Sequence, residues 1–239
     1  MIAFLAALAT AAPSTAQVAS DVTCLSRPQI DQQICLATQH SAAGRYAEAA
    51  TEFEKGAELS RQVAAAFPDV RSHQALAAAG NMWIAAGQPG KAALALDRAL
   101  NGTALQAEQR GEALLDRARA AELQNDLKTA RGKVTEAAAT ISGDPFYWYF
   151  SAALAIREGD KSTAQSAINK ALTLAPNDPT ILFEAGHVAF FLGEEDKARG
   201  YWMRSAGNDP NGSVGKAAAK AVEMLGVTPV VKTETQTPK

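Results

Sequence analysis

The sequence has little histidine and cysteine, two residue types that often catalyse reactions or bind metals: three histidines and two cysteines occur among 239 residues. His40, His73 and His187 are far apart, and none belongs to a His-x-x-x-His or His-Glu pair. The glycine-rich phosphate-binding motifs and the GxSxG nucleophile motif are also missing. These absences predict a noncatalytic protein that has no metal site and needs no cofactor.

An excess of charge of one sign is also missing. The chain has 23 Lys and Arg residues against 25 Asp and Glu residues, a net charge of −2. This balance predicts no electrostatic attraction to nucleic acid or to an acidic membrane surface. Continuous β-branched runs do not occur, so we expect few or no strands. The apolar run at residues 2–12 is shorter than the roughly 20 residues that span a bilayer, so we expect no stable membrane span.

Residues 1–16 are typical of an export signal peptide. An apolar run is followed by Ser14, Thr15 and Ala16, the small residues that a signal peptidase accepts. A typical signal peptide has a Lys or Arg before its apolar run, and this segment has none. We expect cleavage after Ala16 and a periplasmic or secreted mature protein, which begins with an N-terminal segment at residues 17–29. The alternative is an alanine-rich, disordered tail on a cytosolic protein.

Cys24 and Cys35 are the only cysteines. In an exported chain, a single pair suggests a disulfide bond. Their separation does not match the CxxC spacing of redox or zinc sites. The alternative is that both are small, buried thiols.

A repeat of 34 residues dominates the rest of the chain. Copies begin at Gly111, Pro145 and Pro179, and a further copy begins four residues out of step, at His73. Position 8 of the four copies holds Gly80, Ala118, Ala152 and Gly186. Position 15 holds Gly87, Asn125, Gly159 and Gly193. Position 20 holds Ala92, Ala130, Ala164 and Ala198, and position 24 holds Leu96, Val134, Ile168 and Trp202.

This pattern predicts two antiparallel helices in each copy. Positions 4, 7, 8 and 11 form one helical stripe, and positions 20, 24 and 27 form another. Small residues at positions 8 and 20 let the two helices approach closely. Gly or Asn at position 15 can take the left-handed conformation that ends the first helix. Asp126 and Asp160 can cap the second helices, and the Asp-Pro pairs at residues 144–145 and 178–179 can start the first ones.

The pattern resembles the tetratricopeptide repeat family. One repeat matches at Trp148, Ala152, Ala155, Gly159, Ala164, Ile168, Ala171 and Pro176. The next matches at Leu182, Gly186, Ala189, Gly193, Ala198, Trp202, Ser205 and Pro210. A looser, earlier copy has Gly44, Ala49, Phe53 and Gly56. The resemblance implies an all-α, right-handed solenoid of about five helical hairpins at 30–72, 73–110, 111–144, 145–178 and 179–212.

A helix at residues 215–226 is expected to close the solenoid, so that the repeat array and its closing helix occupy residues 30–226. The last residues, 227–239, contain two prolines and four threonines. We expect this C-terminal tail to be disordered.

Five consecutive aromatic residues, 146–150, exceed what one helix stripe can bury. Trp148 is at position 4, so we expect it in the core. The other stripe of this helix and the matching stripe of the next repeat resemble the lining of the concave groove in the family. The candidate partner-binding residues are therefore Phe146, Tyr149, Phe150, Phe183, Glu184, His187 and Phe190, with Glu184 and His187 as polar fixing points. The alternative is that these rings pack on the closing helix or on neighbouring repeats.

The corresponding positions of the earlier repeats are polar. They hold Gln74 and Asn81 in one repeat and Glu112, Asp116, Arg119 and Glu122 in the next. Cochaperone members of the family clamp a carboxylate with Lys, Asn and Arg at such positions. No matching set occurs here, which disfavours a receptor for chaperone tails. The alternative for these polar residues is an ordinary solvated helix face.

The resemblance and the export signal together imply a noncatalytic adaptor in the bacterial envelope or periplasm. It would bind a partner protein or peptide on its concave face. The alternative is an accessory protein that binds a small cell-wall or lipid ligand in the aromatic groove.

Export predicts a specific chain terminus. The protein purified from its native cells should have the intact mass of residues 17–239. Alkylation should add no mass before reduction and should modify two thiols after it. A chain that retains residues 1–16, or two thiols that react without reductant, would contradict the expectation.

Overall fold

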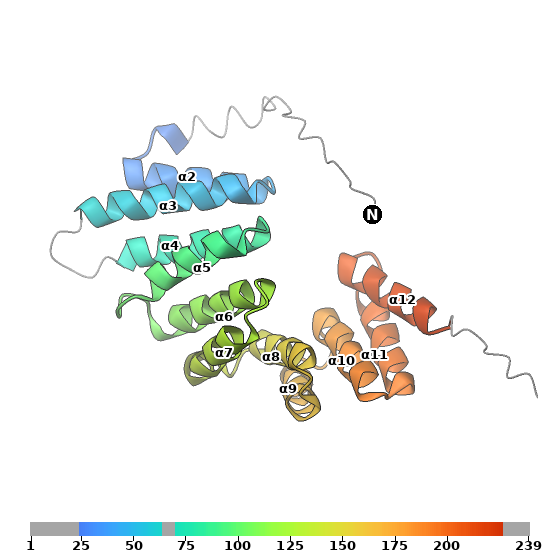
Figure 1. Ribbon diagram of the computed structural model, residues 1–239. Coiled ribbons are helices and arrows are strands. Elements are labelled where there is room, and N and C mark those ends of the chain that lie inside the picture. The colour runs from blue at the N-terminus through green and yellow to red at the C-terminus, as the bar shows by residue number, and fades with distance from the viewer. Residues whose placement is uncertain (1–23, 64–69, 227–239) are drawn as a thin grey trace, which may run out of the picture. The chain divides into compact units, whose positions relative to one another are not determined.

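The computed structural model describes residues 24–63 and 70–226. Eleven complete helices, α2 to α12, and no strands lie in these residues (Figure 1). The predicted all-α fold is therefore confirmed. The expected signal peptide and the C-terminal tail lie outside the described residues. The chain divides into two compact units, residues 1–120 and 121–239, which are described separately.

Unit 1 consists of stacked antiparallel helices. It contains α2 (Gln29–Ala42), α3 (Tyr46–Val63), α4 (Val70–Ala85), α5 (Pro89–Leu100) and most of α6 (Ala107–Leu123). Helix α3 packs against both α2 and α4, and α4 packs against α5 (Figure 1). The longest of these is α3, the second helix of the first hairpin. A disulfide bond joins Cys24 to Cys35 in α2, with 5.6 Å between their Cα atoms.

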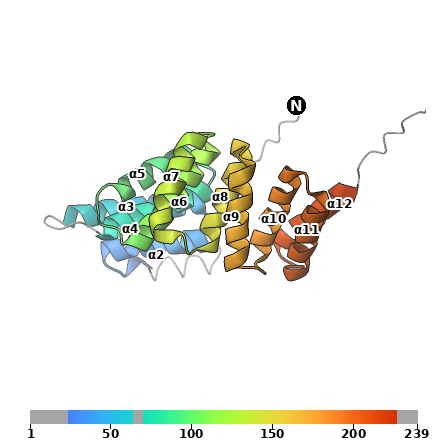
Figure 2. The same ribbon diagram turned by 90° about the horizontal axis from the view of Figure 1, so that it is seen from below.

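Unit 2 continues the same arrangement. It contains α7 (Leu127–Ile141), α8 (Pro145–Glu158), α9 (Lys161–Leu174), α10 (Pro179–Leu192), α11 (Glu195–Asn208) and α12 (Ser213–Gly226). Helices α8 and α9 form one hairpin and α10 and α11 the next, while α12 packs against α11 and α10 (Figure 2). The expected closing helix is thus present and begins two residues earlier than predicted.

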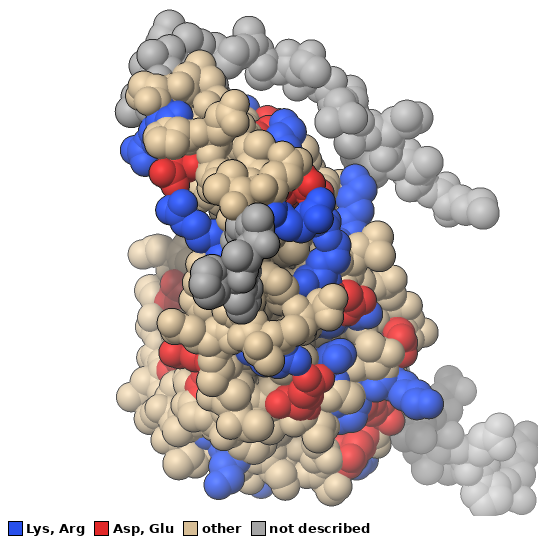
Figure 3. All heavy atoms as spheres, turned by 90° about the vertical axis from the view of Figure 1, so that its left-hand side faces the viewer, with Lys and Arg blue, Asp and Glu red and all other residues tan. Residues whose placement is uncertain are grey.

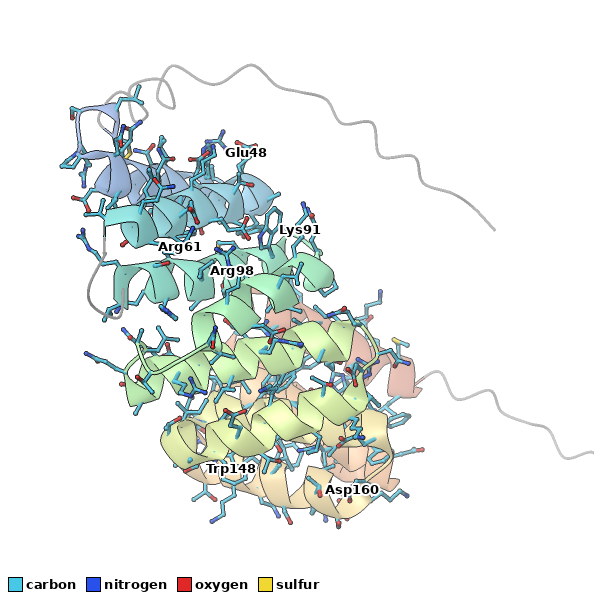
Figure 4. The ribbon with its side chains drawn as sticks, turned by 60° about the vertical axis from the view of Figure 1, so that its left-hand side comes forward. Glu48, Arg61, Lys91, Arg98, Trp148 and Asp160 are labelled. Atoms are coloured by element: carbon cyan, nitrogen blue, oxygen red, sulfur yellow. A yellow bond between two sulfur atoms is a disulfide. The ribbon has the colours of Figure 1, made fainter. Side chains whose placement is uncertain are left out.

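The predicted turn chemistry holds at every repeat. The residue at position 15 has a positive φ in all four copies: Gly87 at 69°, Asn125 at 61°, Gly159 at 76° and Gly193 at 85°. Asp160 caps α9 by accepting hydrogen bonds from the backbone N–H groups of Ser162 and Thr163 (Figure 4). Hydrogen bonds from Thr163, its hydroxyl first, lower the pKa of Asp160 to about 2.

The two helices of a hairpin touch where position 8 meets position 24. A Cβ added to Gly80 would lie 2.3 Å from the Cγ of Leu96, and one added to Gly186 would lie 2.1 Å from the Nε1 of Trp202. The Trp202 ring is held in place because its Nε1 donates to the backbone oxygen of Phe183 at 3.0 Å. The close approach that the sequence predicts is therefore a direct contact between helix backbone and a bulky side chain.

Alanine at position 186 should destabilise the protein because the new methyl group would overlap the Trp202 ring. We expect Gly186→Ala to lower the free energy of unfolding by about 1–3 kcal/mol. Gly200 is a matched control: it lies in α11, is exposed, and would place its Cβ more than 4 Å from other atoms. Gly200→Ala should raise stability by up to about 1 kcal/mol through helix propensity. Urea unfolding followed by circular dichroism measures both, and equal effects would contradict the contact.

Candidate functional site

A cleft with a volume of about 620 Å³ opens on unit 1 between the first helices of successive hairpins. It is called the polar cleft here. Its walls come mainly from α2, α4 and α6. The residues that line it are Thr38, Ser41, Phe53, Gln74, Ala77, Ala78, Asn81, Met82, Leu105, Gln109, Glu112, Ala113 and Asp116.

The polar cleft owes its depth to small side chains. Ala77 and Ala78 of α4 and Ala113 of α6 end at Cβ, so they leave space between the two helices. Phe53 and Met82 add apolar surface to the walls. The result is an alanine floor between larger side chains.

Two side-chain hydrogen bonds connect α4 to α6 across the polar cleft. The Nδ2 of Asn81 donates to the Oδ2 of Asp116 at 2.8 Å, and the Nε2 of Gln74 donates to the Oε1 of Gln109 at 3.3 Å. Asp116 also accepts from Arg119 through its Oδ1 at 3.1 Å. Since residues 74 and 81 are seven positions apart, these bonds lie about 10 Å apart along the helices.

The polar cleft is acidic. Glu112 and Asp116 line it, and no Lys or Arg is among its lining residues. Burial raises the pKa of Asp116 above its ordinary value, against the opposing effects of the Asn81 hydrogen bond and the Arg119 charge. By contrast, both signs of charge are interspersed over the face of the molecule in Figure 3.

A second cleft of about 230 Å³ adjoins the polar cleft and shares Phe53, Gln74 and Ala78 with it. It is called the apolar cleft here, because aliphatic and aromatic side chains form most of its lining. The residues that line it are Ile30, Asp31, Ile34, Phe53, Gly56, Arg71, Gln74, Ala75 and Ala78. Asp31 and Arg71 pair with each other at 3.2 Å. The two clefts adjoin at these shared residues and are together called the trough, which is apolar at one end and acidic at the other.

The structure divides the aromatic candidates of unit 2 between surface and interior. Phe146 and Phe190 are 45% and 51% exposed, whereas Phe150 and Glu184 are only 8% and 7% exposed. Tyr149, Phe183 and His187 are half-buried. Phe150 and Glu184 are therefore buried in unit 2, whereas the sequence analysis placed them on the stripe that lines the groove.

Packing against α11 and α12 explains the partial burial on α10. The Phe183 ring lies against a cluster that includes Trp202 and Ala218 of α12. The His187 ring lies 4.4 Å from Phe183 and 5.6 Å from Trp202, centroid to centroid. Its Nδ1 is 3.2 Å from the Oε2 of Glu184. The two polar fixing points thus pair with each other within the packing of unit 2.

Helix α8 buries a stripe that the sequence analysis did not single out. Trp148, expected in the core, is half-buried, and its Nε1 donates to the backbone oxygen of Ser142 at 2.7 Å (Figure 4). Tyr147, Phe150 and Leu154 are buried instead. Because α8 contacts α7, α9 and α10, more than one of its stripes is covered. The helical periodicity within a single hairpin does not show which stripes the neighbouring helices cover.

Gln74, Asn81, Glu112 and Asp116 stand at groove positions of the repeats, but the sequence alone does not mark them as a site. The sequence analysis missed Gln109, because the expected repeat began at residue 111 whereas α6 begins at Ala107. The spacing of residues 109, 112 and 116 on one helix face could have found it. Within the described residues, no group of three or more His, Cys, Asp or Glu side chains could hold a metal ion. No helix in that part of the chain is long and apolar enough to cross a membrane.

Comparison with known proteins agrees with this geometry. Residues 112–219 match the model of the tetratricopeptide repeat family. This part of the chain carries tetratricopeptide repeats. A search of curated proteins finds no match to the sequence.

Solved structures with the same fold cover the other repeats too. A thermophilic TPR protein from Thermus thermophilus has a TM-score of 0.61 and 18% identity, covering 81% of this chain and 99% of that one. The pilF protein of Pseudomonas aeruginosa has a TM-score of 0.60 and 14% identity, covering 81% and 82%. YrrB, described as a TPR protein with an unusual peptide-binding site, has a TM-score of 0.53 and 16% identity, covering 84% and 98%. At these identities the likeness establishes the fold alone.

Asp116 should make stability depend on pH in an unusual direction. Its pKa is raised in the folded chain, so its stabilising contribution is complete below the unfolded pKa, near 3.8, and is lost as pH rises through the folded pKa. Asp116→Asn should remove this loss, so its stability relative to wild type should increase with pH.

Asp160→Asn provides a control of opposite sign. The folded pKa of Asp160 is about 2, so its contribution is present above 3.8 and is lost as pH falls toward 2. Urea midpoints from pH 2 to 8 measure both variants. A difference between Asp116→Asn and wild type that does not change with pH would contradict the inferred burial of the carboxylate.

Proposed function

We propose that this protein is a noncatalytic adaptor that holds an extended segment of a partner protein in the trough of unit 1. The observation that carries the proposal is the polar cleft itself. Side chains from two helices meet there over an alanine floor, in a volume of about 620 Å³. Specific ligand sites are typically clefts of roughly 300–1,000 Å³ with a few placed polar groups.

The polar groups of the cleft suit a peptide backbone. Gln74, Asn81 and Gln109 carry amides, each of which has both donor and acceptor atoms. An extended backbone presents N–H and C=O groups along both of its edges. The bonded pairs Gln74–Gln109 and Asn81–Asp116 bracket the alanine floor about 10 Å apart, which leaves room for one extended chain between them.

Export to the bacterial envelope is part of the proposal. The disulfide between Cys24 and Cys35 supports it, because such bonds persist in oxidising compartments and are rare in the cytosol. The Cys24 side chain is fully buried, so the bond also ties the start of the described chain to α2.

The aromatic residues of unit 2 form a weaker candidate binding site than the trough. Their exposed rings, Phe146 and Phe190, lie on different helices, and Phe150 and Glu184 are buried. We assign these rings an accessory role in partner contact, whereas the trough unites its polar and apolar groups in one cleft.

Filling the trough should abolish partner binding without unfolding the protein. Ala78 is half-buried and lies where the two clefts join, so Ala78→Trp should occupy both. Ala85→Trp is the matched control, because Ala85 is exposed on the same helix and outside both linings. Immobilised residues 17–239 of each form would be used to capture envelope proteins from the native cells.

A partner held by wild type and by Ala85→Trp, but lost by Ala78→Trp with unchanged circular dichroism, is the expected result. Equal capture by all three forms would show that the trough is not the binding site. No specific capture by wild type would count against the adaptor function.

A further inference from the structure

The trough has different chemistry at its two ends, and this asymmetry restricts what can bind in it. At one end, Glu112 and Asp116 line the polar cleft. Arg119 pairs with Asp116 but is not among the lining residues, so the charged side chains that line this end are both carboxylates. At the other end, Ile30, Ile34 and Phe53 line the apolar cleft.

The acidic end of the trough can accept a hydrogen bond from a further donor. The Asp116 carboxylate is held from both sides, by Asn81 on Oδ2 and by Arg119 on Oδ1, and its side chain is only 17% exposed. Each carboxylate oxygen can accept two hydrogen bonds, so these contacts leave capacity for another donor. A cation entering here would also offset the burial that disfavours the charged carboxylate.

The apolar end is suited to a single side chain. Its volume of about 230 Å³ is below the range of pockets for whole small-molecule ligands. Gly56 keeps it open: a Cβ there would lie 3.1 Å from the Cδ1 of Ile34. An apolar side chain that entered would be covered by Ile30, Ile34 and Phe53.

The distance between the two ends of the trough sets how many peptide residues separate the two side chains that bind there. The ends lie on α2 and α6, with α4 between them. Packed helix axes are about 8–10 Å apart, and α2 packs against α3 rather than directly against α4, so the ends are at least roughly 16–20 Å apart. An extended chain advances about 3.3 Å per residue, which corresponds to at least five or six residues.

We infer that the trough recognises an extended peptide segment with an apolar side chain at one end and a lysine or arginine at least five or six residues away. The apolar side chain occupies the apolar cleft, the backbone crosses the alanine floor between the bonded amide pairs, and the cation reaches Glu112 and Asp116. This inference rests on the proposed function and adds the chemistry of the partner. Charge complementarity selects this occupant over an acidic segment.

The probe is a displayed library of random ten-residue peptides. The library would be selected on immobilised residues 17–239 and depleted on the folded Ala78→Trp variant, so that only trough binders remain. We expect these binders to be enriched in Lys or Arg at a fixed spacing from a large apolar residue. In synthetic copies, Lys or Arg to Gln should weaken binding about tenfold, and substitution by Glu should weaken it further.

Variants of the protein test the same contact from the other side. Glu112→Gln should weaken the basic peptide about five- to tenfold and should leave the Gln-substituted peptide unchanged. Asp97→Asn is the matched control, because the Asp97 carboxylate pairs with Arg117 outside the trough linings. It should bind both peptides as wild type does. Fluorescence anisotropy at low and high salt measures all of these, with a steeper salt dependence for the basic peptide.

The outcomes separate the two proposals. Trough binders that lack a cation, or that bind equally well after Lys or Arg to Glu, would overturn the inferred chemistry and leave the adaptor function standing. A library that yields no peptide dependent on an open trough would overturn both. Loss of binding by Asp97→Asn as well would show a general charge effect and would also overturn the inference.

Discussion

The contact between a residue with almost no side chain and a bulky one sets how closely the two helices approach in the α4–α5 and α10–α11 hairpins. Where Gly80 faces Leu96, and Gly186 faces Trp202, backbone and side chain are so close that even one added carbon would overlap. This contact fixes the rotation of the first helix about its own axis. One remaining face of that helix then points toward the next hairpin, and another points toward the groove. Each repeat contacts mainly its neighbours, so within a unit the rotation set in one hairpin constrains the next.

Alanine serves two purposes in this protein. At position 20 of the repeats it is fully buried and allows the helices to pack closely, as at Ala92, Ala130 and Ala164. At residues 77, 78 and 113 it lies on the groove side and forms the floor of the polar cleft. Since small side chains bury little apolar area, specificity between neighbouring hairpins also needs polar contacts. The Asn81–Asp116 bond supplies one, although it requires a carboxylate to be largely removed from water.

Local rules made most of the fold predictable. The left-handed turns, the aspartate caps and the close helix contacts each depend on a few residues within one repeat, and the structure has them where the sequence indicates. The burial of α8 was harder to predict because it depends on three neighbouring helices at once. Tyr147 and Phe150 are buried although neither is on the hairpin stripe, while Trp148 is only half-buried. A periodic pattern shows how many faces a helix can bury, but not which neighbours will cover them.

The same difference explains why the aromatic residues of unit 2 stand out in the sequence, whereas the polar residues of the trough do not. Phe183 and His187 stand out in the sequence, yet they pack near Trp202 and α12. Gln74, Asn81 and Asp116 look like a solvated helix face until two helices bring them together. Once together, they would select a partner of the proposed adaptor by penalty as well as by attraction. A segment that displaces water from the cleft without replacing its hydrogen bonds would leave buried polar groups unpaired, which costs about 1–3 kcal/mol for each group. An acidic segment would add repulsion from Glu112 and Asp116 to that cost.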